Sequence, residues 1–143
     1  LQKLIQVNHL ENEVKLMGAM EHDKVIQEMK QSILYMMTSY TEALPFVLLE
    51  AISVGLPVIA YDVRVGPKAI IDDGMNGYLI PDNDERKYLQ SLENLLTDER
   101  LRGQMSAAAI KKAQTFSKES VLKKWSSILE EYVDESQRHW SGV

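Results

Sequence analysis

The chain has 143 residues, of which 45% are hydrophobic and 26% charged, and its formal net charge is -5. This balance is typical of a globular chain and argues against wholesale disorder. An acidic chain with scattered Lys and Arg lacks the basic footprint of nucleic-acid-binding proteins. The absence of cysteine excludes disulfides and thiolate metal sites and favours a reducing compartment. We therefore expect a cytoplasmic location, with the inner face of the membrane as an alternative for a longer parent protein.

The apolar segments of the chain are short. None approaches the ~20 residues that a transmembrane helix needs, and no signal peptide is visible, so we expect no membrane span. The chain opens at Leu1 directly in a helix-like pattern, which indicates a piece of a longer protein. Within that piece we expect a single domain over residues 1–143.

Helix-like and strand-like patterns alternate through residue 80. Apolar residues at helical spacing occupy 1–9, and a second helix is expected after Asp23 as its cap. Another helix is expected from Pro45, as its first helical residue, to about Gly55, and a short one over 66–71. Short apolar runs bounded by turn residues are typical of strands, and the four candidates are 14–17, 32–39, 56–61 and 78–80.

The order of these elements predicts a fold class. Alternating strands and helices with short connections favour an α/β domain with a mainly parallel sheet of about four strands. The continuous apolar run at 32–39 predicts a strand buried on both faces. From 84 to 136 the pattern is purely helical. Ser117 is expected to cap a last helix, whose apolar stripe, including Trp125, is expected to pack in the core.

Two loops are candidates for a ligand site, because parallel α/β sheets bind ligands at the carboxyl ends of their strands. These loops are 39–45 and 62–67. The helix that follows the first loop would present free N–H groups and the positive end of its dipole, a suitable seat for a diphosphate. Glu42 lies just before that helix. Its position alone favours a carboxylate that stabilises the dipole, with a ligand contact as the alternative.

Glu50 is the single charged residue in a stretch that is apolar almost throughout, 46–54. A helix that is apolar almost all round is expected to be buried, and a buried carboxylate needs partners. The partner could be a structural side chain, or solvent at an edge of the domain. A ligand diol such as a ribose would serve equally well, because a carboxylate accepts two hydrogen bonds. The local sequence leaves these alternatives open.

Glu42 and Glu50 are separated by seven residues, and the surrounding sequence resembles that of the family-4 retaining glycosyltransferases, which have the GT-B fold and an E-x7-E motif. The resemblance extends over about 14–133. The segment at 61–67 is most similar to glycosyltransferases of wall teichoic acids or adhesin glycans. The other matching positions are Ser39, Leu44-Pro45, Glu50-Ala51, 55–60, Gly66-Pro67 and 73–80.

The resemblance implies an incomplete Rossmann-like carboxy-terminal domain that binds a nucleotide diphosphate sugar, most simply a UDP-linked hexose. Glu50 would hold the ribose hydroxyls, and the backbone at Ala43 and Leu44 would face the diphosphate and the sugar. Glu42 would lie near the anomeric carbon, where an anion stabilises developing oxocarbenium charge. Such enzymes retain the anomeric configuration and need no bound metal or cofactor. We accordingly interpret the acidic stretch 82–84 as a helix cap.

Two departures from the family pattern bear on activity. Ala43 replaces the usual glycine after the first glutamate, and Ala69 replaces an acidic residue that often follows the second loop. A non-catalytic subunit that acts as a scaffold or chaperone is therefore an alternative to the enzyme. A doubly wound sheet that binds another phosphate ligand is a further alternative, although it leaves Glu50 unexplained.

The family's amino-terminal domain, which holds the glycan, polymer or protein acceptor, has no counterpart in the sequence. The first strands of the donor domain and the cations that neutralise the diphosphate also lack counterparts. We therefore expect the fragment alone to be inactive. Without its usual neighbours, the strand at 14–17 is expected either to pair with 33–37 or to find a partner chain through strand-mediated self-association.

Overall fold

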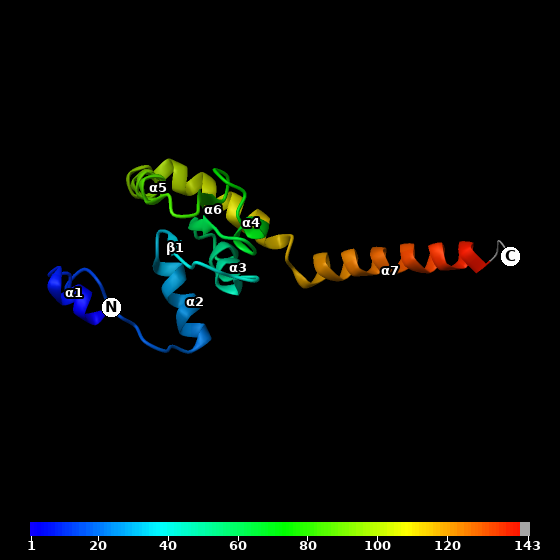
Figure 1. The fold of residues 1–143 in the computed structure, drawn as a ribbon, viewed down its shortest axis with the longest axis horizontal. Coiled ribbons are helices and arrows are strands. Elements are labelled where there is room, and N and C mark those ends of the chain that lie inside the picture. Colours follow the sequence, from blue (N-terminus) through cyan, green and yellow to red (C-terminus); the bar gives the residue numbers. More distant parts are fainter. Residues whose placement is uncertain (141–143) are drawn as a thin grey trace.

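The computed structural model describes the backbone of residues 1–140 and the side chains of residues 1–133. Strands and helices alternate through its first half, which confirms the predicted α/β class, and three helices follow (Figure 1). The elements are α1 (Gln2–Val7), α2 (His22–Gln31), β1 (Tyr35–Met37), α3 (Phe46–Ser53), β2 (Val58–Asp62), α4 (Pro67–Ile70), β3 (Gly77–Pro81), α5 (Glu85–Thr97), α6 (Glu99–Gln114) and α7 (Lys118–Trp140).

The sheet has three strands in the order β1-β2-β3, and both pairings are parallel. Tyr35 is in register with Val58, and Val58 with Gly77. The prediction of a fourth strand at 14–17 is wrong. That segment is irregular and exposed, and β1 pairs with β2 alone among the described strands. Alternating apolar residues form a strand only where a neighbour completes the ladder of hydrogen bonds, and this segment has no such neighbour.

The core lies on both faces of β2. Val58 and Ala60 pack in a cluster with α2 and α3, whereas Ile59 packs on the opposite face with residues of α5 and α6. Successive side chains of a strand point to opposite faces, so a strand covered by helices on both sides is apolar throughout. α3 contributes Leu48 and Ile52, both fully buried, to the first cluster. Burying each of these side chains stabilises the fold by roughly 1.5–3 kcal/mol.

β1 is shorter and less covered than the sequence predicts. The strand spans Tyr35–Met37, and Met36 and Ile33 are 44% and 53% exposed. Tyr35 and Met37 face the cluster that contains α3. The prediction of a strand buried on both faces over 32–39 is therefore wrong, because in this chain helices cover β1 on one face only.

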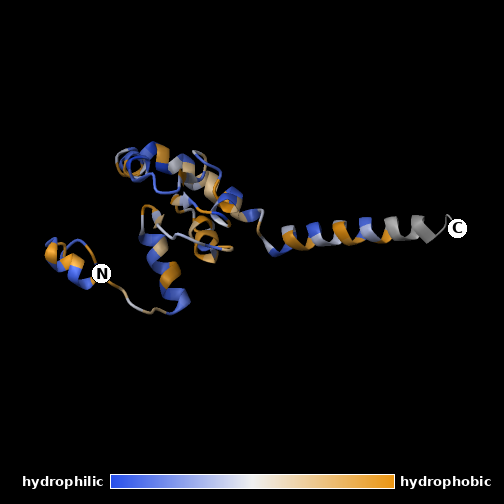
Figure 2. Ribbon diagram, in the orientation of Figure 1, coloured by the Kyte–Doolittle hydropathy of each residue, from blue (hydrophilic) through white to orange (hydrophobic). Residues whose placement is uncertain are grey.

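The long helix α7 extends away from the rest of the molecule (Figure 1). Its apolar residues recur at helical spacing as predicted, but Trp125 is 59% exposed and no side chain between Lys118 and Val133 is buried. Figure 2 shows this alternation of hydrophobic and hydrophilic residues along the helix. The prediction that the stripe packs in the core is wrong, because among the described residues α7 lies beyond the body of the domain.

The helix starts agree with the sequence in part. The carboxylate of Asp84 accepts from the N–H of Lys87, which confirms a helix cap within 82–84, and the hydroxyl of Ser117 accepts from the N–H of Ser120. Asp23 is not the cap of α2, whose N-cap is Glu21 without a side-chain hydrogen bond. Pro45 is the N-cap of α3 rather than its first helical residue.

Candidate functional site

The three strands end at one edge of the sheet because they are parallel. β1 ends at Met37, β2 at Asp62 and β3 at Pro81, so the loops 38–45, 63–66 and 82–84 lie together at that edge. Both loops that the sequence singled out are among them. The architecture therefore places the predicted ligand-binding loops where α/β sheets bind their ligands.

The loop 38–45 delivers Ala43 and Leu44 to the start of α3. Both residues are exposed, and the N-cap Pro45 makes no side-chain capping bond. The first intrahelical bond runs from the N–H of Leu48 to the carbonyl of Pro45. The N–H groups that precede Leu48 in a helix have no intrahelical acceptor and point along the axis, so this helix start can receive an anionic group.

Glu50 lies in the second turn of α3 and, contrary to the expectation, is not buried. Its side chain is 30% exposed, and Phe46 at the start of the same helix is 69% exposed. The carboxylate has a partner on another element: Nε2 of His22, the first residue of α2, lies 2.9 Å from Oε1. Glu50 thus has a structural partner and is partly open to solvent, two of the alternatives that the sequence left open, and the expectation that α3 is buried is wrong for the part of its surface that carries Phe46.

Glu42 is partly exposed in the loop before α3. Burial raises the pKa of the Tyr35 hydroxyl, and the negative charges of Glu42 and Glu50 raise that pKa further. Both carboxylates therefore act on the same phenol of β1.

The loop 63–66 is held against the loop 38–45. Gly66 is buried and has φ +104°, and a Cβ placed on it would lie 2.7 Å from the carbonyl oxygen of Ala43 and 2.7 Å from Cδ of Pro45. This close approach requires glycine. Arg64, in the same loop, is exposed. The second loop thus fixes the backbone of the predicted site by direct contact.

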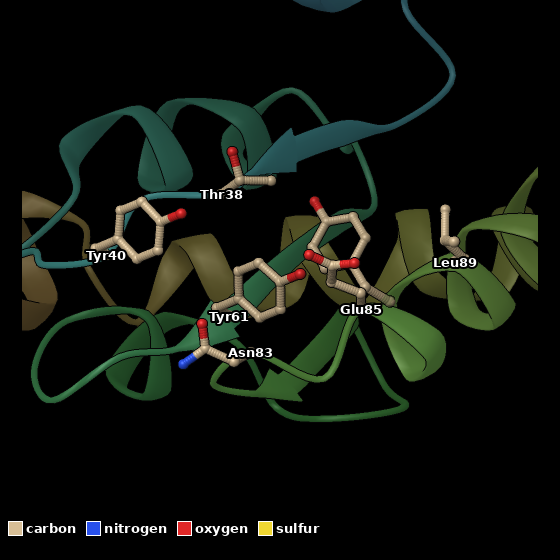
Figure 3. A pocket seen from close by; sticks show the side chains of 7 residues that line it. Thr38, Tyr40, Tyr61, Asn83, Glu85 and Leu89 are labelled. Carbon is tan, nitrogen blue, oxygen red and sulfur yellow. The ribbon is translucent and has the colours of Figure 1, made fainter.

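A separate cavity of about 350 Å³ opens at the same edge of the sheet. Figure 3 shows the rings of Tyr40 and Tyr61 along it. Tyr61 and Tyr88 pack with centroids 4.9 Å apart, and the Tyr88 hydroxyl donates to the Ile59 carbonyl at 3.3 Å. None of the four predicted site residues lines this cavity. Its lining comprises Thr38, Tyr40, Tyr61, Asn83, Glu85, Tyr88 and Leu89.

Sequence reasoning did not identify this cavity. Thr38 follows β1, Tyr61 lies in β2 and Asn83 follows β3, so the three positions share the carboxyl edge of the sheet. That common position at the carboxyl edge was the one feature of the sequence that could have predicted the cavity. Residues 1–133, whose side chains are described, contain no cluster of His, Asp and Glu able to hold a metal ion. No helix in the described part of the chain has the length and apolar character to span a membrane.

Residues 1–112 match the family model described as glycosyl transferases group 1. The chain belongs to this family. The amylovoran biosynthesis glycosyltransferase AmsD of Erwinia amylovora is 34% identical over 125 residues, which are 87% of this chain and 34% of that protein. The group 1 chain spans 14% to 34% of the length of the curated relatives it matches.

Solved structures give the same placement. The pneumococcal O-GlcNAc transferase GtfA in complex with UDP and GlcNAc is 31% identical and superposes with a TM-score of 0.76 over 92% of this chain and 27% of GtfA. Staphylococcus aureus TarM, in a complex that contains UDP, is 28% identical with a TM-score of 0.79 over 88% of this chain and 25% of TarM. The fold is that of the carboxy-terminal domain of GT-B glycosyltransferases, as predicted.

Proposed function

We propose that this group 1 chain is the donor-binding part of a retaining glycosyltransferase, which transfers a hexose from a UDP-linked sugar to a glycan, polymer or protein acceptor. The observation that carries the proposal is the arrangement around α3. Glu50 presents a partly exposed carboxylate, Ala43 and Leu44 lie exposed at the helix start, and Glu42 lies in the loop just before that start.

Each group has a role that follows from its chemistry. The carboxylate of Glu50 can accept hydrogen bonds from a ribose diol, because an ionised carboxylate has about four lone-pair sites and no donor. The start of α3, beside Ala43 and Leu44, offers N–H groups and a positive dipole end to the diphosphate. Glu42 supplies a negative charge close to the sugar, where positive charge develops at the anomeric carbon in the transition state.

The relatives suggest a narrower acceptor class. GtfA is named as a peptide N-acetylglucosaminyltransferase, and a Bacillus subtilis relative at 29% identity is named as a poly(glycerol-phosphate) alpha-glucosyltransferase. By analogy with these relatives, we propose that the acceptor is a protein or a polyol-phosphate polymer. The chain alone is expected to bind the donor weakly and to be inactive, since Arg64 is the single cation of the loops 38–45, 63–66 and 82–84.

Titration of UDP and UDP-glucose into the intact protein tests the proposal. We expect Glu50→Ala to weaken UDP binding by about tenfold or more, as loss of a hydrogen-bonding carboxylate predicts. Glu93→Ala, which changes an exposed glutamate of α5, is the matched control and should leave the affinity unchanged. Equal UDP affinity in Glu50→Ala and the wild type would refute the ribose assignment. Absence of UDP binding in the wild type would favour the non-catalytic scaffold.

A further inference from the structure

The contact between His22 and Glu50 joins two elements that are distant in sequence. His22 begins α2 and Glu50 lies within α3, 28 positions further along the chain. The 2.9 Å separation of Nε2 and Oε1 is within the range of a charge-assisted hydrogen bond. Neither the family model nor the E-x7-E resemblance gives His22 a role, so the contact adds a residue to the neighbourhood of the predicted site.

The chemistry of the pair sets the direction of the hydrogen bond. An ionised carboxylate has no proton to donate, so Nε2 of His22 carries the hydrogen and donates it to Oε1 of Glu50. The other ring nitrogen, Nδ1, lies 3.8 Å from Oδ1 of Asp23, beyond hydrogen-bonding distance. The imidazole is therefore directed at Glu50 rather than shared equally between two carboxylates.

The bond leaves Glu50 able to bind a ligand. Among the described residues, the hydrogen bond from His22 is the one made to its carboxylate, and it occupies one of about four acceptor positions. The Glu50 side chain is 30% exposed and that of His22 is 66% exposed, so the pair is open to solvent. A free glutamate samples several rotamers, whereas a tethered one has already lost part of that freedom before a ligand arrives.

We propose that His22 is a positioning residue for ribose recognition: it holds Oε1 of Glu50 and thereby presents the remaining acceptor positions of the carboxylate to the hydroxyls of the nucleotide. This role rests on the proposed function of Glu50. It makes α2, which precedes the E-x7-E segment, part of the donor site. It also accounts for a carboxylate held in place on a helix that carries no other charged residue.

The test compares two ligands with the intact protein. UDP carries both ribose hydroxyls, whereas 2′,3′-dideoxyuridine diphosphate carries neither, so the ratio of their affinities measures recognition of the diol alone. His22→Phe keeps an aromatic ring without the N–H donor, and His22→Gln restores a donor on a side chain of similar reach. Lys24→Ala, at an exposed position in the first turn of α2, controls for changes to the helix.

We expect His22→Phe to weaken UDP binding about three- to tenfold and to leave dideoxy-UDP binding unchanged, with His22→Gln close to the wild type. Equal loss for both ligands would overturn the proposal, because His22 would then act elsewhere than the ribose. Unchanged or tighter UDP binding in His22→Phe would also overturn it, the latter by showing that His22 competes with ribose for Glu50.

Glu50→Ala separates this proposal from the one on which it rests. If Glu50→Ala lowers the preference for UDP over dideoxy-UDP and His22→Phe does not, the proposed function stands and the role of His22 fails. If Glu50→Ala leaves that preference intact, the ribose assignment itself fails.

Discussion

Gly66 lies so close to Ala43 that the two loops of the predicted donor site form one packed unit. A Cβ on Gly66 would come within 2.7 Å of the Ala43 carbonyl oxygen, and the φ of +104° is one that side chains rarely adopt. We therefore expect Gly66→Ala to lower the free energy of unfolding by about 2–4 kcal/mol and to weaken UDP binding, because the backbone at Ala43 must move. Denaturant titration and UDP titration measure the two effects.

Gly74→Ala is the control for this prediction. Gly74 also has a positive φ, +75°, but a Cβ there would meet no atom within 4 Å. Gly74→Ala should lower the free energy of unfolding by about 1–2 kcal/mol, because alanine disfavours a positive φ, and should leave UDP affinity unchanged. If Gly66→Ala were no more destabilising than Gly74→Ala, the contact between the loops would have no energetic weight.

Glu42 should affect turnover more than binding. Glu42→Gln keeps the shape of the side chain and removes its charge, so it removes an interaction that strengthens only as positive charge develops on the sugar. We expect kcat of the intact protein to fall by about 100-fold and the Kd for UDP to change by less than about twofold. Steady-state kinetics with UDP-glucose and UDP titration provide the two numbers. Unchanged kcat would contradict a role at the anomeric centre and leave Glu42 as a carboxylate that stabilises the α3 dipole.

The buried phenol of Tyr88 makes stability depend on pH in the alkaline range. Burial raises its pKa to about 12, and neighbouring Tyr61 adds to the effect. Between pH 10 and 12 the phenol ionises in the unfolded chain while it stays protonated in the folded one, so stability falls as pH rises. The loss attributable to Tyr88 is about 1.4 kcal/mol at pH 11. The free energies of unfolding of the wild type and Tyr88→Phe, measured at pH 8 and pH 11, should therefore show a difference that shifts by about 1.4 kcal/mol in favour of the variant at the higher pH. A difference that is the same at both pH values would contradict the assignment.

Local sequence patterns predicted those parts of the fold whose partners the chain contains. The strand expected at 56–61 is present as β2, and α3 and α5 cover its two faces. The segment 14–17 was also expected as a strand from its alternating apolar residues, but it has no neighbouring strand and forms none. Hydrophobic periodicity reports what a segment can bury, and only the rest of the fold decides whether a surface for it is present.

The candidate site shows the same division. The loops at the carboxyl edge followed from the parallel order of the strands, which the sequence predicted correctly. The pairing of His22 with Glu50 could not be predicted from the order of the strands, since it depends on how α2 packs against α3. The aromatic cavity around Tyr61 and Tyr88 was missed for the same reason, because its residues come from the loops after β1 and β3, from β2 and from α5.

The exposed stripe of α7 predicts that the body of the domain is stable without this helix. All side chains between Val121 and Val133 are exposed, whereas Phe116, just before the helix, packs against the core cluster of α3. A chain that ends at Ser117 should therefore unfold with a free energy within about 0.5 kcal/mol of the whole chain, as expected for changes remote from the core. Phe116→Ala in the whole chain should instead cost about 1–3 kcal/mol, because it removes partly buried packing contacts. A loss on truncation as large as that of Phe116→Ala would show that α7 packs against the body in solution.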